Sequence, residues 1–385
     1  MTSRPLSPVA RLVEDHAQDF LRAVSARLVD LAPDSRGHFP TPDDRTHISI
    51  VELLSSLLDG TGEEGKVDEE TLEFFQHAAI DARRFGLTSD MLQALDEAIQ
   101  IELRRLCEDL PFESVLYAER AVHAAATAGI EGVRQAEERG IPAFIQAEVA
   151  EVEKRSRRFS VVRLLAEREL PYLPGQYVPV TTNFLPNTWR YACPSIPSNE
   201  WGQVEFHIQS DRDDIASLLA SSRPGDTWSI GTGQGDFGQE SVQSGRDLLF
   251  ISHGIGLAPL RAHMIDLINQ AEPPRLHFFV GADYPGELYE LTGMWNFAAS
   301  SPRLSVVPVS VHEKDEWWVQ ATEASKPPRG LHLHQTGSMA KIVTDAGAWA
   351  DRDVLIAGPE VWARDLRRAM IRRGTPAAQI EILGL

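Results

Sequence analysis

The chain has 385 residues, of which 43% are hydrophobic and 24% charged, a composition typical of a globular protein with two or three domains. Its formal net charge of −19 repels other polyanions, so nucleic acid and anionic membrane are not expected partners. The two cysteines, Cys107 and Cys193, are too few for a disulfide framework and predict reduced thiols in a cytoplasmic protein. We expect no signal peptide and no membrane-spanning segment.

Residues 1–140 are predicted to form an all-α domain. Apolar residues at helical spacing run from Val9 to Leu31, and Pro33 ends this predicted helix because proline disfavours helix in the residue before it. Four later segments show the same spacing: Ile48–Leu58, Thr71–Phe85, Asp90–Leu106 and Glu113–Glu138. Helices of this number and length pack around a shared core or a ligand.

Residues 141–243 are predicted to form a small antiparallel β-barrel. Apolar and polar residues alternate in places between Phe144 and Leu165, and turn residues then recur. The turns are Pro174-Gly175, Pro186-Asn187, Pro197-Ser198 and Pro224-Gly225.

Residues 244–385 alternate between strand and helix, which predicts an α/β domain with a parallel, doubly wound sheet. The predicted strands are Asp247–Ile251, Arg275–Val280, Leu304–Val309 and, as the last one, Asp353–Ala357. The predicted helices are Pro259–Gln270 and Trp362–Arg373.

A glycine loop between the first of these strands and its helix is the best local signal of a binding site. Gly254 and Gly256 would let backbone N–H groups approach a phosphate at the helix N-terminus. A tight strand-to-helix turn also needs glycine without any ligand, so this alternative stays open. Arg190 near a strand end and Ser217 near a helix start are further candidates for phosphate contacts, or else a surface arginine and a helix cap.

Taken in order, these elements resemble the ferredoxin-reductase module of flavohemoglobins, and the helical part resembles their globin. The reductase motifs are Pro174-Gly175-Gln176-Tyr177, Arg190-Tyr191-Ala192-Cys193, Arg223-Pro224-Gly225-Asp226, Gly254 to Pro259 and Ala357-Gly358-Pro359. The globin-like segments are Ala26–Pro33, Gly37–Pro40 and Arg83–Leu87. The resemblance implies FAD beside the barrel, NADH at the glycine loop and haem among the helices.

The resemblance also implies roles for single residues. It places FAD contacts at Arg190, Tyr191, Ala192, Cys193 and Ser217, and nicotinamide-dinucleotide contacts at Gly254, Gly256, Pro259, Gly358 and Pro359. Asp283 stands where some relatives carry an arginine for the extra phosphate of NADP, so the resemblance favours NADH. No catalytic residue and no metal ligand is singled out.

The departures from the family pattern cluster on its chemistry. Ala82 takes the place of the histidine that holds haem iron, and Ser25 takes that of the tyrosine beside bound oxygen. We therefore expect no haem and no nitric oxide dioxygenation, with His47 and His77 ranked last as substitute ligands.

The reductase part departs in the same way. Ala192 replaces a tyrosine that stacks on the flavin, which forfeits roughly 0.5–1.5 kcal/mol of stacking, and Cys193 replaces a serine. His253 replaces the first glycine of the dinucleotide loop, and Ala357 replaces a cysteine near the nicotinamide.

Two functional hypotheses follow. The first is a haem-free FAD/NADH oxidoreductase that passes electrons to an unidentified acceptor or protein partner, favoured by the retained Arg190, Ser217 and glycine loop. The second is a pseudoenzyme, a regulatory or interaction scaffold with lost cofactor sites, favoured by the coinciding replacements at five family positions.

Overall fold

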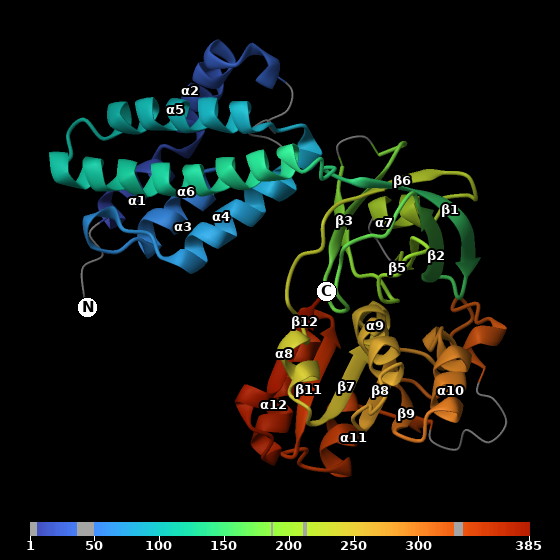
Figure 1. The fold of residues 1–385 in the computed structure, drawn as a ribbon. Coiled ribbons are helices and arrows are strands. Elements are labelled where there is room, and N and C mark those ends of the chain that lie inside the picture. Colours follow the sequence, from blue (N-terminus) through green and yellow to red (C-terminus); the bar gives the residue numbers. More distant parts are fainter. Residues whose placement is uncertain (1–5, 37–49, 186–187, 211–213, 327–333) are drawn as a thin grey trace. The chain divides into compact units, whose positions relative to one another are not determined.

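A computed structural model describes residues 6–36, 50–185, 188–210, 214–326 and 334–385 (Figure 1). The chain divides into two compact units, residues 1–144 and residues 145–385. Within these ranges, none of the helices is both long enough and apolar enough to span a membrane.

The first unit is built from helices. They are α1 (Ser7–Asp15), α2 (Ala17–Leu31), α3 (Ile50–Gly60), α4 (Glu69–Ala82), α5 (Ser89–Leu106) and α6 (Phe112–Glu138). The single helix predicted from Val9 to Leu31 is wrong, because His16 has a non-helical backbone (φ −113°, ψ 22°) and separates α1 from α2. The buried positions Val13 and Phe20 lie seven residues apart, so the apolar spacing continues across the break and hides it.

Helix α4 lies close against α6 because two glycines of α6 face it. A Cβ atom placed on Gly129 would lie 2.9 Å from Cβ of Ala79, and one placed on Gly132 would lie 2.5 Å from Cγ of Gln76. None of the residues of α4 is fully buried. The contact therefore depends on the absence of side chains on α6 and not on a large apolar face of α4.

The second unit begins with a six-stranded antiparallel sheet. Its strands are β1 (Ile145–Lys154), β2 (Phe159–Ala166), β3 (Val178–Thr182), β4 (Arg190–Ala192), β5 (Gln203–Gln209) and β6 (Thr227–Ile230). The strand order is β4-β3-β6-β1-β2-β5, and a bridge between Pro194 and Phe206 joins the two edges, so the barrel is nearly closed. Trp228 and Phe206 stack in its core with ring centroids 5.8 Å apart.

A six-stranded parallel sheet follows in the same unit. Its strands are β7 (Asp247–His253), β8 (Leu276–Ala282), β9 (Leu304–Ser310), β10 (Gln335–Thr336), β11 (Arg352–Gly358) and β12 (Ile380–Gly384), in the order β10-β9-β8-β7-β11-β12. The prediction that Asp353–Ala357 is the last strand is wrong, because β12 pairs with β11 after it. Its Ile-Glu-Ile alternation is short and lies at the sheet edge, where the local signal is weakest.

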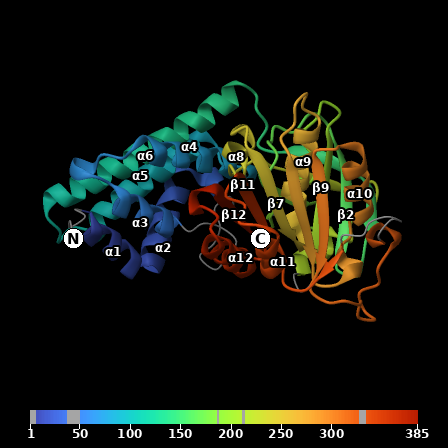
Figure 2. The same cartoon turned by 90° about the horizontal axis from the view of Figure 1, so that it is seen from below.

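Helices cover both faces of this parallel sheet (Figure 2). Helices α9 (Leu257–Ile268) and α10 (Leu291–Ser300) pack on the face that carries Leu248 and Phe250. Helices α11 (Met339–Ala346) and α12 (Glu360–Arg373) pack on the face that carries Leu249 and Ile251. Successive residues of one strand thus enter opposite cores, which explains the unbroken apolar run of β7.

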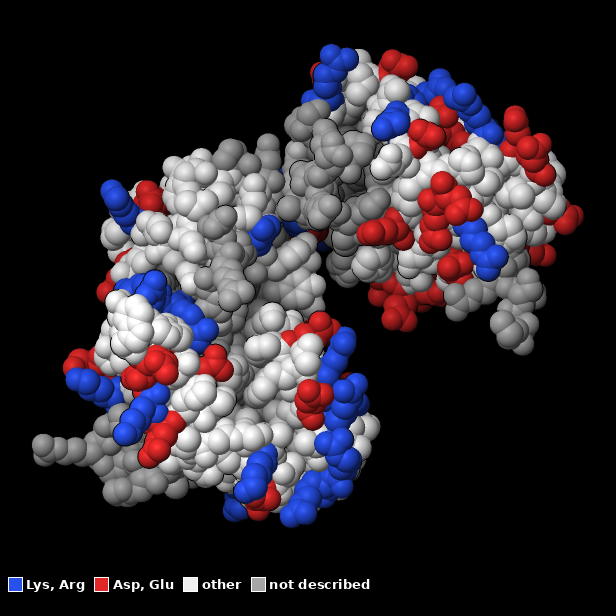
Figure 3. Space-filling view, turned by 180° about the vertical axis from the view of Figure 1, so that it is seen from behind, with Lys and Arg blue, Asp and Glu red and all other residues white. Residues whose placement is uncertain are grey.

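Charge is unevenly distributed over the second unit. Lys and Arg side chains gather over α12, in contrast to the acidic balance of the whole chain (Figure 3). The arginines of this helix are Arg364, Arg367, Arg368, Arg372 and Arg373.

Candidate functional site

The order of the parallel strands defines one place where a ligand is expected. The chain runs from β7 through β8, β9 and β10 on one side, and then returns to β11 and β12 on the other. In such sheets, ligands bind in the crevice outside the carboxyl ends of the strands where the order reverses. Here that switch point lies between His253, which ends β7, and Gly358, which ends β11.

The glycine loop lies beside this switch point and is packed on both sides. A Cβ atom on Gly256 would lie 2.1 Å from the carbonyl oxygen of Ala357, so only glycine permits the loop to lie this close to β11. Gly254 has φ +58°, and a Cβ atom there would lie 2.9 Å from Oε1 of Gln209. Pro259 is buried in the first turn of α9. Packing accounts for both glycines, and phosphate binding by this loop stays a prediction.

The structure brings His253 together with residues that the sequence did not group with it. Its ring lies 5.2 Å from the Trp362 ring of α12, measured between centroids. Its Nε2 lies 3.2 Å from Oδ1 of Asp283, the residue after β8. The hydrogen bond with His253, together with that from Arg158, outweighs partial burial and lowers the pKa of Asp283 to about 2.

The barrel contributes a second candidate site, at the edge formed by β3 and β4. Val180 pairs with Arg190, and Val178 pairs with Ala192. Arg190 is half-buried, whereas Tyr191 is 55% exposed, and its ring meets the ring of Tyr177 edge-on at 5.1 Å. The comparison with the family motif concerned the replacement at Ala192, so it did not predict that Tyr191 contacts Tyr177. The two nearby tyrosines flanking a turn-rich segment were the available signal.

Gln234 completes this edge. Its backbone pairs with that of Tyr177, and within the described residues its side-chain nitrogen Nε2 is buried without a hydrogen-bond partner. A buried donor without a partner is costly unless a ligand or water accepts from it. A half-buried guanidinium, one exposed and one half-buried aromatic ring, and an amide donor without a partner among the described residues are groups that fit FAD, which offers a pyrophosphate, flat rings and carbonyl oxygens.

Cys193 and Ser217, which are also predicted to contact FAD, differ in their exposure to solvent. Cys193 is 8% exposed, and burial raises the pKa of its thiol to about 12, so it stays a neutral thiol at ordinary pH. Ser217 is exposed and is the fourth residue of α7 (Asp214–Leu219), three residues after the helix begins. A contact of either residue with FAD stays a prediction.

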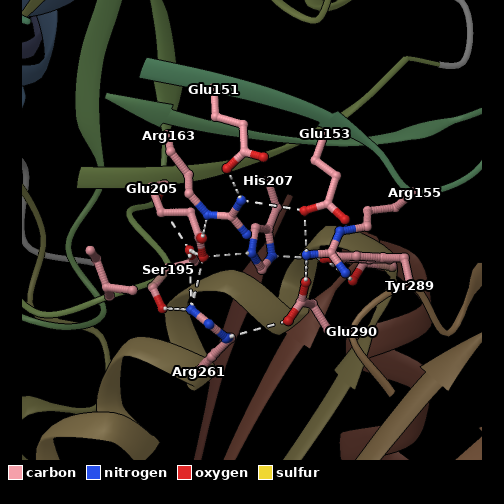
Figure 4. Close-up of polar contacts among 12 residues, drawn as sticks. Glu151, Glu153, Arg155, Arg163, Ser195, Glu205, His207, Arg261, Tyr289 and Glu290 are labelled. Atoms are coloured by element: carbon pink, nitrogen blue, oxygen red, sulfur yellow. Dashed lines mark hydrogen bonds and ion pairs between the residues drawn. The ribbon is translucent and has the colours of Figure 1, made fainter. Parts of the chain in front are cut away.

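A buried charge network joins the barrel to the parallel sheet (Figure 4). At its centre, Glu205 of β5 accepts hydrogen bonds from Nε of Arg163 at 2.8 Å, Oγ of Ser195 at 2.7 Å and Nη1 of Arg261 at 2.9 Å. Arg261 comes from α9, the helix that follows the glycine loop. The network therefore ties the loop's own helix to the barrel.

The same network continues along the same face of β5 to His207, whose Nε2 lies 3.3 Å from Oε1 of Glu205. Nδ1 of His207 lies 3.0 Å from the hydroxyl oxygen of Tyr289, and Nη2 of Arg155 lies 3.1 Å from Oε1 of Glu290. Burial alone would raise the pKa of the Glu205 carboxyl, but His207 and the nearby cations hold it well below its ordinary value. Glu205 is therefore a buried carboxylate that depends on these partners.

Sequence reasoning missed this network. The segment Gln203–Gln209 alternates strictly between polar and apolar residues, which predicts a strand with one polar face. Alternation does not reveal that another part of the same unit covers this polar face.

The end of α4 in the first unit carries Ala82 where the resemblance implies a histidine that binds haem iron, and a methyl group cannot bind iron. Ala82 ends the helix, and Arg84 lies two residues later with its side chain 6% exposed. Arg84 forms an ion pair with Asp81, and its guanidinium lies 4.6 Å from the Phe85 ring centroid. The charged and aromatic side chains that flank Ala82 in the sequence thus contact one another.

The other residues considered for haem give it no support. His77 is exposed on α4, and Ser25 is exposed on α2. His47 and Phe39 lie outside the described residues. In the described ranges, no cluster of three or more His, Cys, Asp or Glu side chains is arranged to hold a metal ion.

No family model matches the chain. Among curated proteins, it is 28% identical over 155 residues to the reductase component of phenol 2-monooxygenase from Pseudomonas sp. strain CF600, covering 39% of this chain and 43% of that protein. It is 30% identical over 139 residues to the toluate 1,2-dioxygenase electron transfer component of Pseudomonas putida, covering 36% of this chain and 40% of that protein. The chain thus spans less than half the length of these relatives.

Solved structures extend the likeness in fold. A flavohemoglobin from Malassezia yamatoensis, with bound FAD and haem, has a TM-score of 0.69 at 15% identity and covers 99% of both chains. The Amycolatopsis cytochrome P450 reductase GcoB has a TM-score of 0.53 at 20% identity, covering 63% of this chain and 69% of that one. The barrel and parallel sheet therefore have the fold of FAD- and NAD-dependent reductases.

Proposed function

We propose that this chain is a haem-free, FAD-binding oxidoreductase of the reductase type that does not perform nitric oxide dioxygenation. The observation that carries the proposal is the β3–β4 edge. There the Tyr177–Tyr191 ring pair and Arg190 accompany Gln234, whose backbone pairs with that of Tyr177 and whose buried amide nitrogen has no partner among the described residues. Retention of a cationic and aromatic edge supports a bound flavin nucleotide more than a bare scaffold.

The chain's residues would hold FAD by complementary chemistry. Arg190 would pair with the pyrophosphate, because a guanidinium matches phosphate oxygens with parallel hydrogen bonds. Tyr177 and Tyr191 would offer ring faces and edges to the cofactor's flat rings, and Gln234 would donate a hydrogen bond from Nε2. FAD, once bound, would supply the chemistry of hydride and electron transfer.

The proposed partner is a protein electron acceptor. The relatives named above are a reductase component and an electron transfer component of oxygenases, which supports the transfer of electrons to a separate protein. Ala82 at the end of α4 offers no ligand to haem iron, which supports an acceptor other than haem in the same chain. We propose the cytoplasm as its location and NADH as its electron donor.

The alternative is a scaffold without catalysis. The observation that favours it is the switch point, where His253 and Trp362 lie against each other at the place expected for a dinucleotide. A chain with both cofactor sites closed would act through protein contacts alone.

One spectroscopic titration separates these functions. The purified full-length protein is mixed with FAD under anaerobic conditions, excess FAD is removed, and the visible spectrum is recorded before and after addition of NADH and then dithionite. We expect a stoichiometric flavin spectrum without a Soret band, bleached by dithionite. A protein that takes up no FAD would overturn the proposal in favour of the scaffold, and a Soret band would overturn its haem-free part.

A further inference from the structure

A buried tyrosine lies at the junction between the barrel and the glycine loop. Tyr289 comes shortly before α10, is 2% exposed, and stacks its ring on that of Phe159 with centroids 4.6 Å apart. Phe159 of β2 also lies beside the loop, because a Cβ atom placed on Gly254 would lie 3.7 Å from Cζ of Phe159. The Tyr289 ring is thus held in place, whereas its hydroxyl hydrogen can still rotate.

The Tyr289 hydroxyl has two possible acceptors for its hydrogen. Its oxygen lies 3.0 Å from Nδ1 of His207 and 3.5 Å from the carbonyl oxygen of Gly254. Burial raises the pKa of the Tyr289 hydroxyl well above its ordinary value, so the group keeps its hydrogen near neutral pH. This hydrogen can point to one of the two acceptors at a time.

The charge of His207, which lies between Glu205 and Tyr289, determines the acceptor (Figure 4). Nε2 of His207 faces the Glu205 carboxylate at 3.3 Å, and a carboxylate only accepts, so Nε2 carries a hydrogen. In the neutral ring, Nδ1 has no hydrogen and accepts from Tyr289. In the charged ring, Nδ1 donates to Tyr289, and the hydroxyl is left to donate to Gly254.

The charged groups around this pair keep their state while His207 changes its own. Glu205 is also bound by Arg163 and Arg261, and beside Tyr289 the side chain of Arg155 pairs with that of Glu290. Guanidinium groups do not lose their proton in proteins, and His207 and the nearby cations hold the pKa of Glu205 well below its ordinary value. Histidine is the side chain whose charge ordinarily changes between about pH 5 and 8.

We infer that one proton on His207 acts as a pH-operated switch that sets the contact between Tyr289 and the glycine loop. At lower pH, Nδ1 of His207 takes up a proton from solvent, and the Tyr289 hydroxyl donates to the carbonyl oxygen of Gly254. At higher pH, Nδ1 returns the proton to solvent and accepts from Tyr289, and Gly254 is left with the backbone N–H of Leu257 as a donor. This proton switch goes beyond the proposed function, because it acts on the loop whether or not a dinucleotide binds there.

Two measurements on the full chain test the proton switch. Nitrogen-15 NMR of histidine-labelled protein follows the protonation of the His207 ring between about pH 5 and 8.5. Hydrogen–deuterium exchange, corrected for the intrinsic effect of pH, follows the amides of residues 255–258 over the same range. We expect Nδ1 to lose its proton as the pH rises, and the loop amides to exchange about two- to tenfold faster with the same midpoint, as for the loss of one hydrogen bond.

Two variants remove different parts of the proton switch. His207→Gln cannot take up the proton, so its corrected loop exchange should not depend on pH. Tyr289→Phe keeps the ring that stacks on Phe159 but lacks the hydroxyl. In this variant His207 should still titrate, while the loop no longer responds. The two variants alter different elements, so a folding defect in one leaves the other informative.

His277 of β8 provides a matched control. Its Nδ1 lies 3.2 Å from Nη1 of Arg352, and a guanidinium only donates, so this nitrogen accepts in the neutral ring. Burial, together with the charge of Arg352, lowers the pKa of His277. His277→Gln should therefore leave the response of the loop to pH as it is in the wild type.

His253 offers another route from pH to the loop, and the variants separate the two routes. It directly precedes Gly254, and its Nε2 lies 3.2 Å from Oδ1 of Asp283. A loop response that survives in Tyr289→Phe would belong to His253 and would overturn the proton switch. A His207 ring that keeps one charge state over the whole range, or loop exchange that does not follow its titration, would overturn it as well. None of these results bears on FAD binding, which the spectroscopic titration decides separately.

Discussion

The second unit has two candidate cofactor sites, the β3–β4 edge and the switch point. They differ in how far their groups are already packed against other residues of the chain. At the β3–β4 edge, Tyr191 is 55% exposed and the amide nitrogen of Gln234 has no partner among the described residues. At the switch point, the glycines face Trp362, His253 and Gln209 at distances that leave no room for a Cβ atom. The first site exposes an aromatic ring to solvent and leaves an amide donor without a partner among the described residues, whereas the glycines of the second are packed against other residues of the chain.

This difference teaches that the replacements in the two motifs do not have the same consequence. At the barrel edge, Ala192 removes one tyrosine, but Tyr191 and Tyr177 still present an aromatic pair. At the switch point, His253 adds a side chain where a glycine was expected, and that side chain binds Asp283 and packs on Trp362. A loss at the first site is partly offset by neighbours, whereas a gain at the second adds a side chain that packs beside Gly358.

The largest expected effect comes from breaking the buried charge network that joins the barrel to α9. Glu205→Ala removes the acceptor shared by Arg163, Ser195 and Arg261 and leaves their buried donors without it. Removing one partner from a buried ion pair costs about 3–5 kcal/mol, so the free energy of unfolding should fall by that amount. Urea unfolding followed by tryptophan fluorescence measures it.

Glu151→Ala is the matched control for this change. Glu151 also pairs with Arg163, at 2.6 Å, but its side chain is 57% exposed. An exposed pair contributes about 0–1 kcal/mol, so this variant should stay close to the wild type. Equal losses in the two variants would show that the Glu205 network is not the buried connection between the barrel and the sheet.

The sequence predicts the elements of this fold better than it predicts the site. The predicted range Asp90–Leu106 differs from α5 by one residue, and the apolar run of β7 correctly indicates a strand buried on both faces. These features depend on local periodicity, which is written in neighbouring residues. The contacts of Glu205 and His253 depend on residues far along the chain, and no local pattern reveals which side chain covers another.

The next effect in size tests whether the barrel edge holds a cofactor. Arg190→Ala should weaken FAD binding by about tenfold to a hundredfold, because a hydrogen bond to a charged group contributes about 1.5–3 kcal/mol. Fluorescence quenching of FAD during titration with protein measures the change. Arg168, exposed on the same barrel, provides the control, and an equal effect of Arg168→Ala would show that only general charge matters.

A smaller effect is expected from the aromatic pair. Tyr191→Ala removes one ring of the pair with Tyr177, and stacking contributes about 0.5–1.5 kcal/mol beyond the area buried. FAD affinity should therefore fall by about twofold to tenfold. Tyr191→Phe keeps the ring and should bind FAD as the wild type does. A loss of the same size in Tyr191→Phe would mean that the hydroxyl matters and not the ring.

The smallest effect sharpens the description of the closed switch point through its pH dependence. The pKa of Asp283 is lowered from 3.8 to about 2, so its ionised form is stabilised by folding. This contribution is fully present above about pH 4 and is lost as the pH falls toward 2, because the unfolded chain takes up a proton first. The Asp283 side chain is 44% exposed, so solvent screening reduces the contribution to about 1 kcal/mol.

The test compares the free energy of unfolding at pH 5 and at pH 3. Over this range, wild-type protein should lose more free energy of unfolding than Asp283→Asn, by up to about 1 kcal/mol. Asp351→Asn, at a position 74% exposed, should follow the wild type. Identical slopes for the wild type and Asp283→Asn would mean that Asp283 is not held by His253 and Arg158 in solution, and that the crevice is more open than its side chains indicate.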